Sequence, residues 1–117
     1  MWIGELSRRT GVSTRLLRYY EEQGLLHPER DANGYRRYRP EAVGRVAHIR
    51  RLLATGLSTE TIRDFLPCAE EEPAGPAGCA GYIDMLESHR SRLARDIAEL
   101  QRRHEALSAY ASVLRPG

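Results

Sequence analysis

Cationic side chains gather in the first third of the chain, in a pattern suited to binding a polyanion. Arg15 and Arg18 are three residues apart, so on a helix they lie on roughly one face. A second basic run follows, in which tyrosines alternate with Arg36, Arg37 and Arg39. Sequence-specific DNA binding needs cations for phosphates, side chains that reach base edges and a rigid mount for both. We therefore predict that residues 13–38 bind DNA.

The candidate contacts combine guanidinium groups with hydroxyl groups that can donate hydrogen bonds to phosphates. They are Arg15, Arg18, Arg36, with Arg37 or Arg39 on alternating strand faces, and Tyr19, Tyr35 and Tyr38. Each arginine taken alone could be an ordinary solvated side chain on a basic protein. The set is more specific, because a helix-turn-helix and a hairpin frame it. Tyr20 is expected in the core, beside Leu16 and Leu17, which we also expect to point inward.

Two short helices are expected to mount these side chains. The first covers residues 3–10, and Gly11 then provides a tight turn. Ser13 is a good N-cap for a second helix over residues 14–23, which Gly24 ends. Helix, glycine turn and helix within about 20 residues is the spacing of a helix-turn-helix.

A hairpin, or wing, is expected over residues 25–39. Its signal is the dipeptide Asn33-Gly34, which favours a type I′ turn in which both residues have positive φ. The returning strand, residues 35–39, carries the arginines and tyrosines that would touch the DNA backbone beside the helix-turn-helix.

The fold class expected for the whole chain is mostly α: a winged helix-turn-helix domain followed by a long coiled-coil helix. After Pro40, apolar residues at helical spacing predict a third helix that ends at Gly56, and Ser58 caps a fourth. We expect the DNA-binding domain to cover residues 1–67, an acidic connector rich in Pro and Gly to cover 68–81, and the dimerisation helix to cover 82–114.

The last helix carries a heptad pattern that predicts self-association. Its apolar seam, interrupted by Arg90 and His104, includes Ile83, Leu86, Leu93, Ile97, Leu100, Leu107 and Leu114. Alone, such a helix would leave this narrow stripe in water. The chain has no second long helix to cover it, so a homodimer is the economical inference.

Three segments together resemble the DNA-binding domain of the MerR family of bacterial transcription regulators. They are residues 3–13 (IGELSRRTGVS), 17–26 (LRYYEEQGLL) and 33–38 (NGYRRY), with the family spacing kept through Leu66. The resemblance implies that DNA-contacting positions fall at Ser13, Arg15, Arg18, Tyr19, Arg36, Arg37 and Tyr38. The family commonly has Thr where this chain has Leu16, which puts the local operator preference in question.

The resemblance also implies partners and a mechanism. Such regulators form homodimers through an antiparallel coiled coil, bind a palindromic operator in double-stranded promoter DNA, and assist RNA polymerase by bending and untwisting an over-long spacer. The expected function is thus a promoter regulator whose effector is unknown. The alternatives are an accessory or architectural DNA-binding protein without an effector, and a coiled-coil protein whose winged domain binds another protein.

Cys68 and Cys79 flank the connector and leave three interpretations open. Each can be a small apolar filler at a helix boundary, the reading we favour. The connector could instead fold back so that both thiols form a redox switch, or join a metal site with other ligands. Cys79, before a helix, is the better nucleophile candidate. The metal-binding loop of metal-sensing relatives is missing, so we expect no metal.

The bulk properties fit a cytoplasmic DNA-binding protein and exclude other classes. Residues 1–67 hold 12 Arg against 8 Asp and Glu, whereas residues 68–117 hold 6 Arg against 8. The basic end is therefore the predicted DNA-binding end. No apolar run approaches the ~20 residues of a membrane span, and no phosphate loop or catalytic constellation is present. We expect a protein that is neither an enzyme nor membrane-bound and that needs no cofactor.

Overall fold

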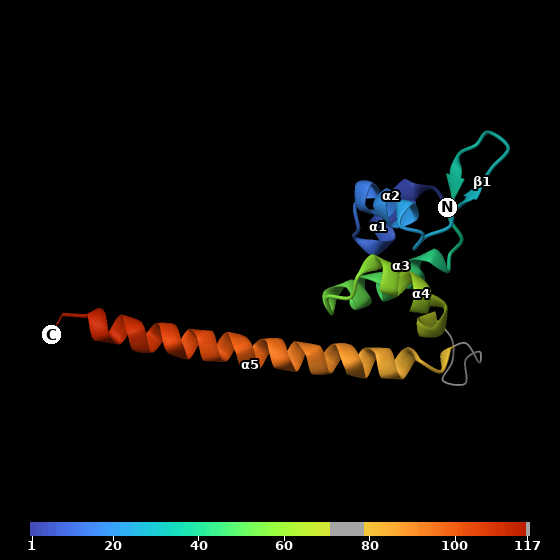
Figure 1. Ribbon diagram of the computed structural model, residues 1–117. Coiled ribbons are helices and arrows are strands. Elements are labelled where there is room, and N and C mark those ends of the chain that lie inside the picture. Colours follow the sequence, from blue (N-terminus) through green and yellow to red (C-terminus); the bar gives the residue numbers. More distant parts are fainter. Residues whose placement is uncertain (71–78, 117) are drawn as a thin grey trace. The chain divides into compact units, whose positions relative to one another are not determined.

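The computed structural model describes residues 1–70 and 79–116, with the side chains of residues 69 and 70 left out. The chain divides into two compact units, Met1–Cys79 and Ala80–Gly117. The first contains four helices and a hairpin, and the second is dominated by one long helix (Figure 1). The expected fold class, a winged helix-turn-helix followed by a long helix, is confirmed.

The first two helices form the predicted helix-turn-helix. Helix α1 covers Ile3–Thr10 and helix α2 covers Thr14–Glu22. Gly11 ends α1 with φ of 72°, a left-handed conformation that glycine adopts without a Cβ penalty. Ser13 begins α2: its side chain accepts a hydrogen bond of 3.1 Å from the Leu16 N–H. Both ends of the turn therefore follow the sequence expectation.

The wing is a short antiparallel hairpin whose turn differs from the prediction. Strands β1 (Glu29–Arg30) and β2 (Arg36–Arg37) pair antiparallel, with Glu29 opposite Arg37. The expected type I′ turn is wrong, because Gly34 has φ of 80° but Asn33 lacks the positive φ that this turn also requires. The Asp31 carboxylate accepts hydrogen bonds from the N–H groups of Asn33 (2.9 Å) and Tyr35 (3.0 Å). This longer turn needs only one left-handed residue.

Two further helices complete the first unit. Helix α3 covers Ala42–Ala54, and helix α4 covers Thr59–Glu70. The first residues of the connector expected over 68–81 are helical instead, because α4 contains Pro67 and continues to Glu70. Most of the predicted connector, residues 71–78, lies outside the described residues.

The core of the first unit is apolar and draws on every element except the strands. Helix α3 packs against both α1 and α4, and α1 packs against α2. Among the described residues, the side chains with 2% exposure or less are Leu6, Leu17, Tyr20, Leu25, Leu26, Val46, Ile49, Ile62 and Leu66. Tyr20 and Leu17 are buried as expected. Leu16 is not: 40% of its surface is exposed, which corrects the inward placement.

Helix α5 covers Tyr82–Leu114, the bounds that the heptad pattern predicted. Its 33 residues would span about 50 Å at about 1.5 Å per residue. None of its residues is buried. Within the described part of the chain, no helix has both the length and the apolar character to cross a membrane.

The neighbouring residues Leu16 and Leu17 provide a matched test of this core. Replacing Leu17, which is fully buried, with Ala should lower the free energy of unfolding by about 2–5 kcal/mol through the lost contacts and the cavity left behind. Leu16→Ala should change it by no more than about 0.5 kcal/mol, because the side chain lies at the surface. Urea denaturation measures both; equal costs would contradict the assignment of the two faces.

Candidate DNA interface

The outer face of α2 carries two exposed arginines. Arg15 and Arg18 are exposed and make no hydrogen bond or ion pair with any described residue. Tyr19 beside them is 43% exposed. The opposite face, with Leu17 and Tyr20, is buried, so the helix cannot turn to hide the arginines. Unpaired guanidinium groups on a fixed helix are suited to phosphates and base edges.

Ser13 lies at the N-terminal end of this face with its hydroxyl in a defined place. Its oxygen accepts the Leu16 N–H at 3.1 Å, which satisfies one of the unpaired donors of the first helical turn. The hydroxyl hydrogen is not used in that bond, so it can still be donated to a phosphate. The serine can therefore be both a helix cap and a DNA contact.

Glu21 joins the wing to α2 through two ion pairs. One carboxylate oxygen lies 2.5 Å from Nε of Arg36 and the other lies 3.2 Å from a terminal nitrogen of Arg30. The hydrogen bond to Glu21 raises the pKa of the Arg36 guanidinium. The sequence reading named Arg36 and missed Glu21, whose partner is 15 residues away. Arg36 is thus already engaged in holding the wing against α2.

Trp2 forms a second attachment on the wing. The Arg37 guanidinium carbon lies 3.4 Å from the centre of the Trp2 ring, a cation–π contact, and Asp31 lies 3.7 Å from Arg37 Nε. Tyr35 packs edge-to-face on the same ring at 6.1 Å. Arg37 and Tyr35 remain exposed, as a DNA contact requires. No pattern in the sequence pointed to Trp2.

The burial of Tyr38 does not fit the direct DNA contact that the sequence predicts, because only 4% of its surface is exposed. Its hydroxyl is buried without a hydrogen-bond partner among the described residues. Burial raises the pKa of the Tyr38 phenol, and the nearby Glu21 carboxylate raises it further. The Tyr38 backbone N–H donates to the Met1 carbonyl at 2.7 Å, and the Met1 amino group donates to the Tyr38 carbonyl at 2.6 Å. Tyr38 therefore anchors the end of the wing.

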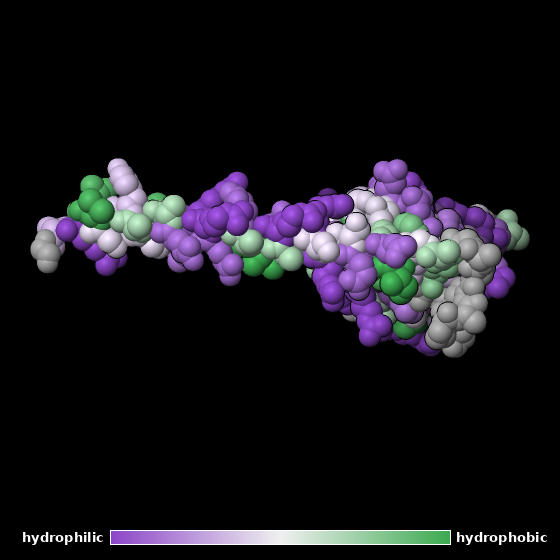
Figure 2. Space-filling view, turned by 60° about the horizontal axis from the view of Figure 1, so that its bottom comes forward, coloured by the Kyte–Doolittle hydropathy of each residue, from purple (hydrophilic) through white to green (hydrophobic). Residues whose placement is uncertain are grey.

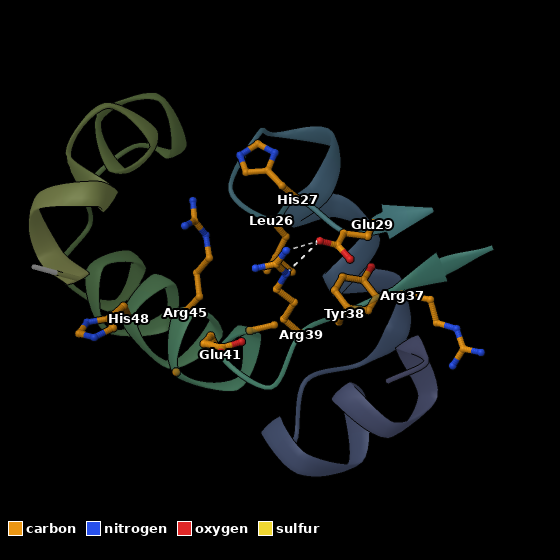
Figure 3. Close-up of a pocket in the computed structure, with 11 residues that line it drawn as sticks. Leu26, His27, Glu29, Arg37, Tyr38, Arg39, Glu41, Arg45 and His48 are labelled. Carbon is orange, nitrogen blue, oxygen red and sulfur yellow. Dashed lines mark hydrogen bonds and ion pairs between the residues drawn. The ribbon is translucent and has the colours of Figure 1, made fainter. Parts of the chain in front are cut away.

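A cavity of about 470 Å³ lies between the base of the wing and α3 (Figure 3). Its charged groups partly neutralise one another: two Arg39 nitrogens lie 2.9 and 2.6 Å from one Glu29 oxygen. Arg45 donates to the Leu25 carbonyl at 2.7 Å. Arg39, which the sequence offers beside Arg37 as a contact to the DNA backbone, is thus paired with Glu29. Nowhere in the described residues do three or more His, Cys, Asp or Glu side chains gather as metal ligands would.

Cys68 and Cys79 are joined by a disulfide, with Cα atoms 5.5 Å apart. The favoured interpretation, two separate apolar fillers, is therefore wrong, because the two residues meet despite a separation of 11 along the chain. The bond connects the last part of α4 to the residue three positions before α5.

Helix α5 exposes much of its heptad seam. Ile83, Ile97, Leu100, Leu107 and Leu114 are each 57–67% exposed, Leu93 is 40% exposed, and Leu86 is half-buried. Arg90, which interrupts the seam, lies 3.1 Å from Glu87. In the space-filling view, apolar patches alternate with hydrophilic ones along α5 (Figure 2). An exposed apolar seam of this length is suited to pairing with another helix.

Two family models match the chain. "MerR HTH family regulatory protein" matches residues 1–67, and "MerR, DNA binding" matches residues 43–110. The chain is also 35% identical over 107 residues to the HTH-type transcriptional regulator HmrR of Rhizobium leguminosarum bv. viciae, covering 92% of this chain and 83% of that protein.

Solved structures have the same fold at lower identity. The transcription regulator PbrR691 of Ralstonia metallidurans CH34, solved in complex with lead(II), matches with a TM-score of 0.83 and 24% identity, covering 100% of this chain and 89% of that one. HiNmlR, a MerR family regulator lacking the sensor domain and solved bound to promoter DNA, matches with a TM-score of 0.61 and 24% identity over 95% of this chain and 86% of that one. The two family models and the similarity to HmrR show that the chain belongs to the MerR family of DNA-binding transcription regulators, which are not enzymes.

Proposed function

We propose that the chain acts as a homodimer on a palindromic operator within a promoter spacer, and that the Cys68–Cys79 pair controls it. In the cytoplasm, the dimer distorts the promoter spacer and so changes how RNA polymerase uses the promoter. The observation that carries the DNA-binding part is the outer face of α2, where Arg15 and Arg18 are exposed and unpaired among the described residues. The effector chemistry rests on the disulfide alone.

The rigid mount of the α2 face supports base reading rather than loose attraction to DNA. Cations on mobile segments bind phosphates without regard to sequence. Here the buried Leu17 and Tyr20 hold the helix, and Glu21 fixes the wing to it through Arg30 and Arg36. A fixed helix and a fixed wing can impose one orientation on the duplex, and bending the duplex adds specificity at uncontacted steps.

Replacing Arg18 with Ala tests the role of this face. If Arg18 reaches a base, specific affinity should fall by about 1–3 kcal/mol while non-specific binding changes little. Arg95→Ala is the control, because Arg95 is also exposed but lies outside the heptad seam of α5. Fluorescence anisotropy with a selected operator and a scrambled duplex measures both affinities. Equal operator affinity for the wild type and Arg18→Ala would remove Arg18 from the interface.

Dimerisation is supported by α5, which has no buried residue but carries an exposed apolar seam. An isolated helix is marginal in water, and packing an amphipathic face is what stabilises it. Pairing with a second copy would cover the seam and also set two α2 helices at the spacing of two operator half-sites.

Light scattering at micromolar concentration tests the dimer. The wild type should have twice the mass of the 13.3 kDa chain. Ile97→Asp combined with Leu100→Asp should give a monomer, because each charge would be buried in the interface. Arg95→Ala should stay dimeric. A monomeric wild type would contradict the proposal.

Redox control is supported by the position of the disulfide. Oxidation of the two thiols by hydrogen peroxide forms one S–S bond, and the O–O bond of the peroxide breaks as its two oxygens take up the thiol protons and leave as two water molecules. The product ties α4 of the DNA-binding unit to the segment that leads into α5. Reduction frees that segment, so the link between DNA binding and dimerisation differs between the two states.

Operator binding should therefore depend on the thiol state. Reduced and peroxide-treated protein should differ in affinity or in footprint, by about 5–150-fold if the coupling is of ordinary allosteric size. Cys68→Ser and Cys79→Ser should each abolish the difference, and both variants should behave as the reduced wild type does. Identical footprints before and after oxidation would exclude the switch and favour a DNA-binding protein without this effector.

A further inference from the structure

We infer that Leu16 determines operator specificity by contacting the 5-methyl group of a thymine in the major groove. The inference rests on the proposed specific binding through α2. Leu16 is the third residue of α2, and 40% of its surface is exposed, whereas the next residue, Leu17, is fully buried. The core is therefore complete without Leu16, and the side chain of Leu16 lies at the surface.

The surroundings of Leu16 favour DNA as its partner. Arg15 precedes it, and Tyr19, one turn further along the same face, is 43% exposed. Arg18 completes the outward group. A lone leucine within a cluster of unpaired cations is poorly placed for a protein hydrophobic interface, because burying those cations would be costly. A polyanion neutralises the cations and at the same time can bring an apolar group to the leucine.

The backbone at Leu16 is held in place, which makes specific recognition feasible. Its N–H donates to the Ser13 hydroxyl oxygen at 3.1 Å, within the capped first turn of the helix. The first residues of a recognition helix are those that reach base edges when the helix enters the major groove. Leu16 is therefore at a position where a side chain is both exposed and fixed.

The chemistry of the base edges then selects thymine. Leucine neither donates nor accepts a hydrogen bond, so it cannot distinguish bases by their polar groups. The 5-methyl of thymine is the apolar group that the major groove offers. Cytosine has only a hydrogen at that carbon, so the methyl contact is lost, and its neighbouring 4-amino donor would be covered by leucine without a partner. Leu16 should thus favour thymine at one position of each half-site.

Replacing single thymines with deoxyuridine, which removes only the methyl group, tests this directly. An operator is first selected from random duplexes with the wild-type dimer, and dissociation constants are then measured for each substituted duplex. At one thymine per half-site, deoxyuridine should weaken wild-type binding by about three- to tenfold, the effect of one buried methyl group. Leu16→Ala should bind the unsubstituted operator more weakly and lose nothing more at that position.

Arg18→Ala is the matched control, because it should weaken binding yet keep the sensitivity to deoxyuridine. The inference is overturned if no thymine position distinguishes the wild type from Leu16→Ala, or if Leu16→Ala binds the operator as tightly as the wild type. Dependence on Arg18 without dependence on Leu16 would leave the proposed function intact and reject only this contact. Failure to select any sequence would instead reject specific binding, and this inference with it.

Discussion

Leu17 and Tyr20 place one side of α2 in the core of the first unit, and the α-helical repeat then determines what the other side presents. With about 3.6 residues per turn, burial of these two positions directs Arg15, Leu16, Arg18 and Tyr19 outward. None of these four needs to move to meet a ligand. The same burial that stabilises the domain therefore preorganises its cationic surface, and binding does not have to order that helix.

The wing is held differently, since its strands are only two residues long and could not be stable alone. Its attachments are polar and backbone contacts: Glu21 to two arginines, the Trp2 ring over Arg37, and the pairing of Met1 with Tyr38. The Glu21 carboxylate is only 21% exposed, so its two ion pairs hold the wing in one position beside α2. They fix the wing beside α2 and leave Arg37 and Tyr35 exposed.

The long helix differs from α2, because none of the residues of α5 is buried among the described residues. In the proposed dimer, a second copy of α5 would cover the apolar seam that these exposed side chains form. The Cys68–Cys79 bond lies at the junction, with one cysteine on α4 and the other just before α5. A bond at that place can couple the state of two thiols to the element that would join two DNA-binding domains.

The sequence by itself determined the helix-turn-helix, the existence of the wing and the bounds of α5, because these depend on local signals: a cap at Ser13, a glycine turn and a heptad repeat. Only the tertiary structure decided that Leu16 is exposed whereas Leu17 is buried, and that Tyr38 belongs to the core. It also revealed the ion pairs of Glu21, the continuation of α4 through Pro67 and the pairing of the cysteines. Periodicity identifies an amphipathic helix but leaves the edge of its apolar face undefined. Which residues are buried also depends on neighbours distant in sequence, as at Tyr38, whose backbone pairs with Met1, and no local pattern encodes such neighbours.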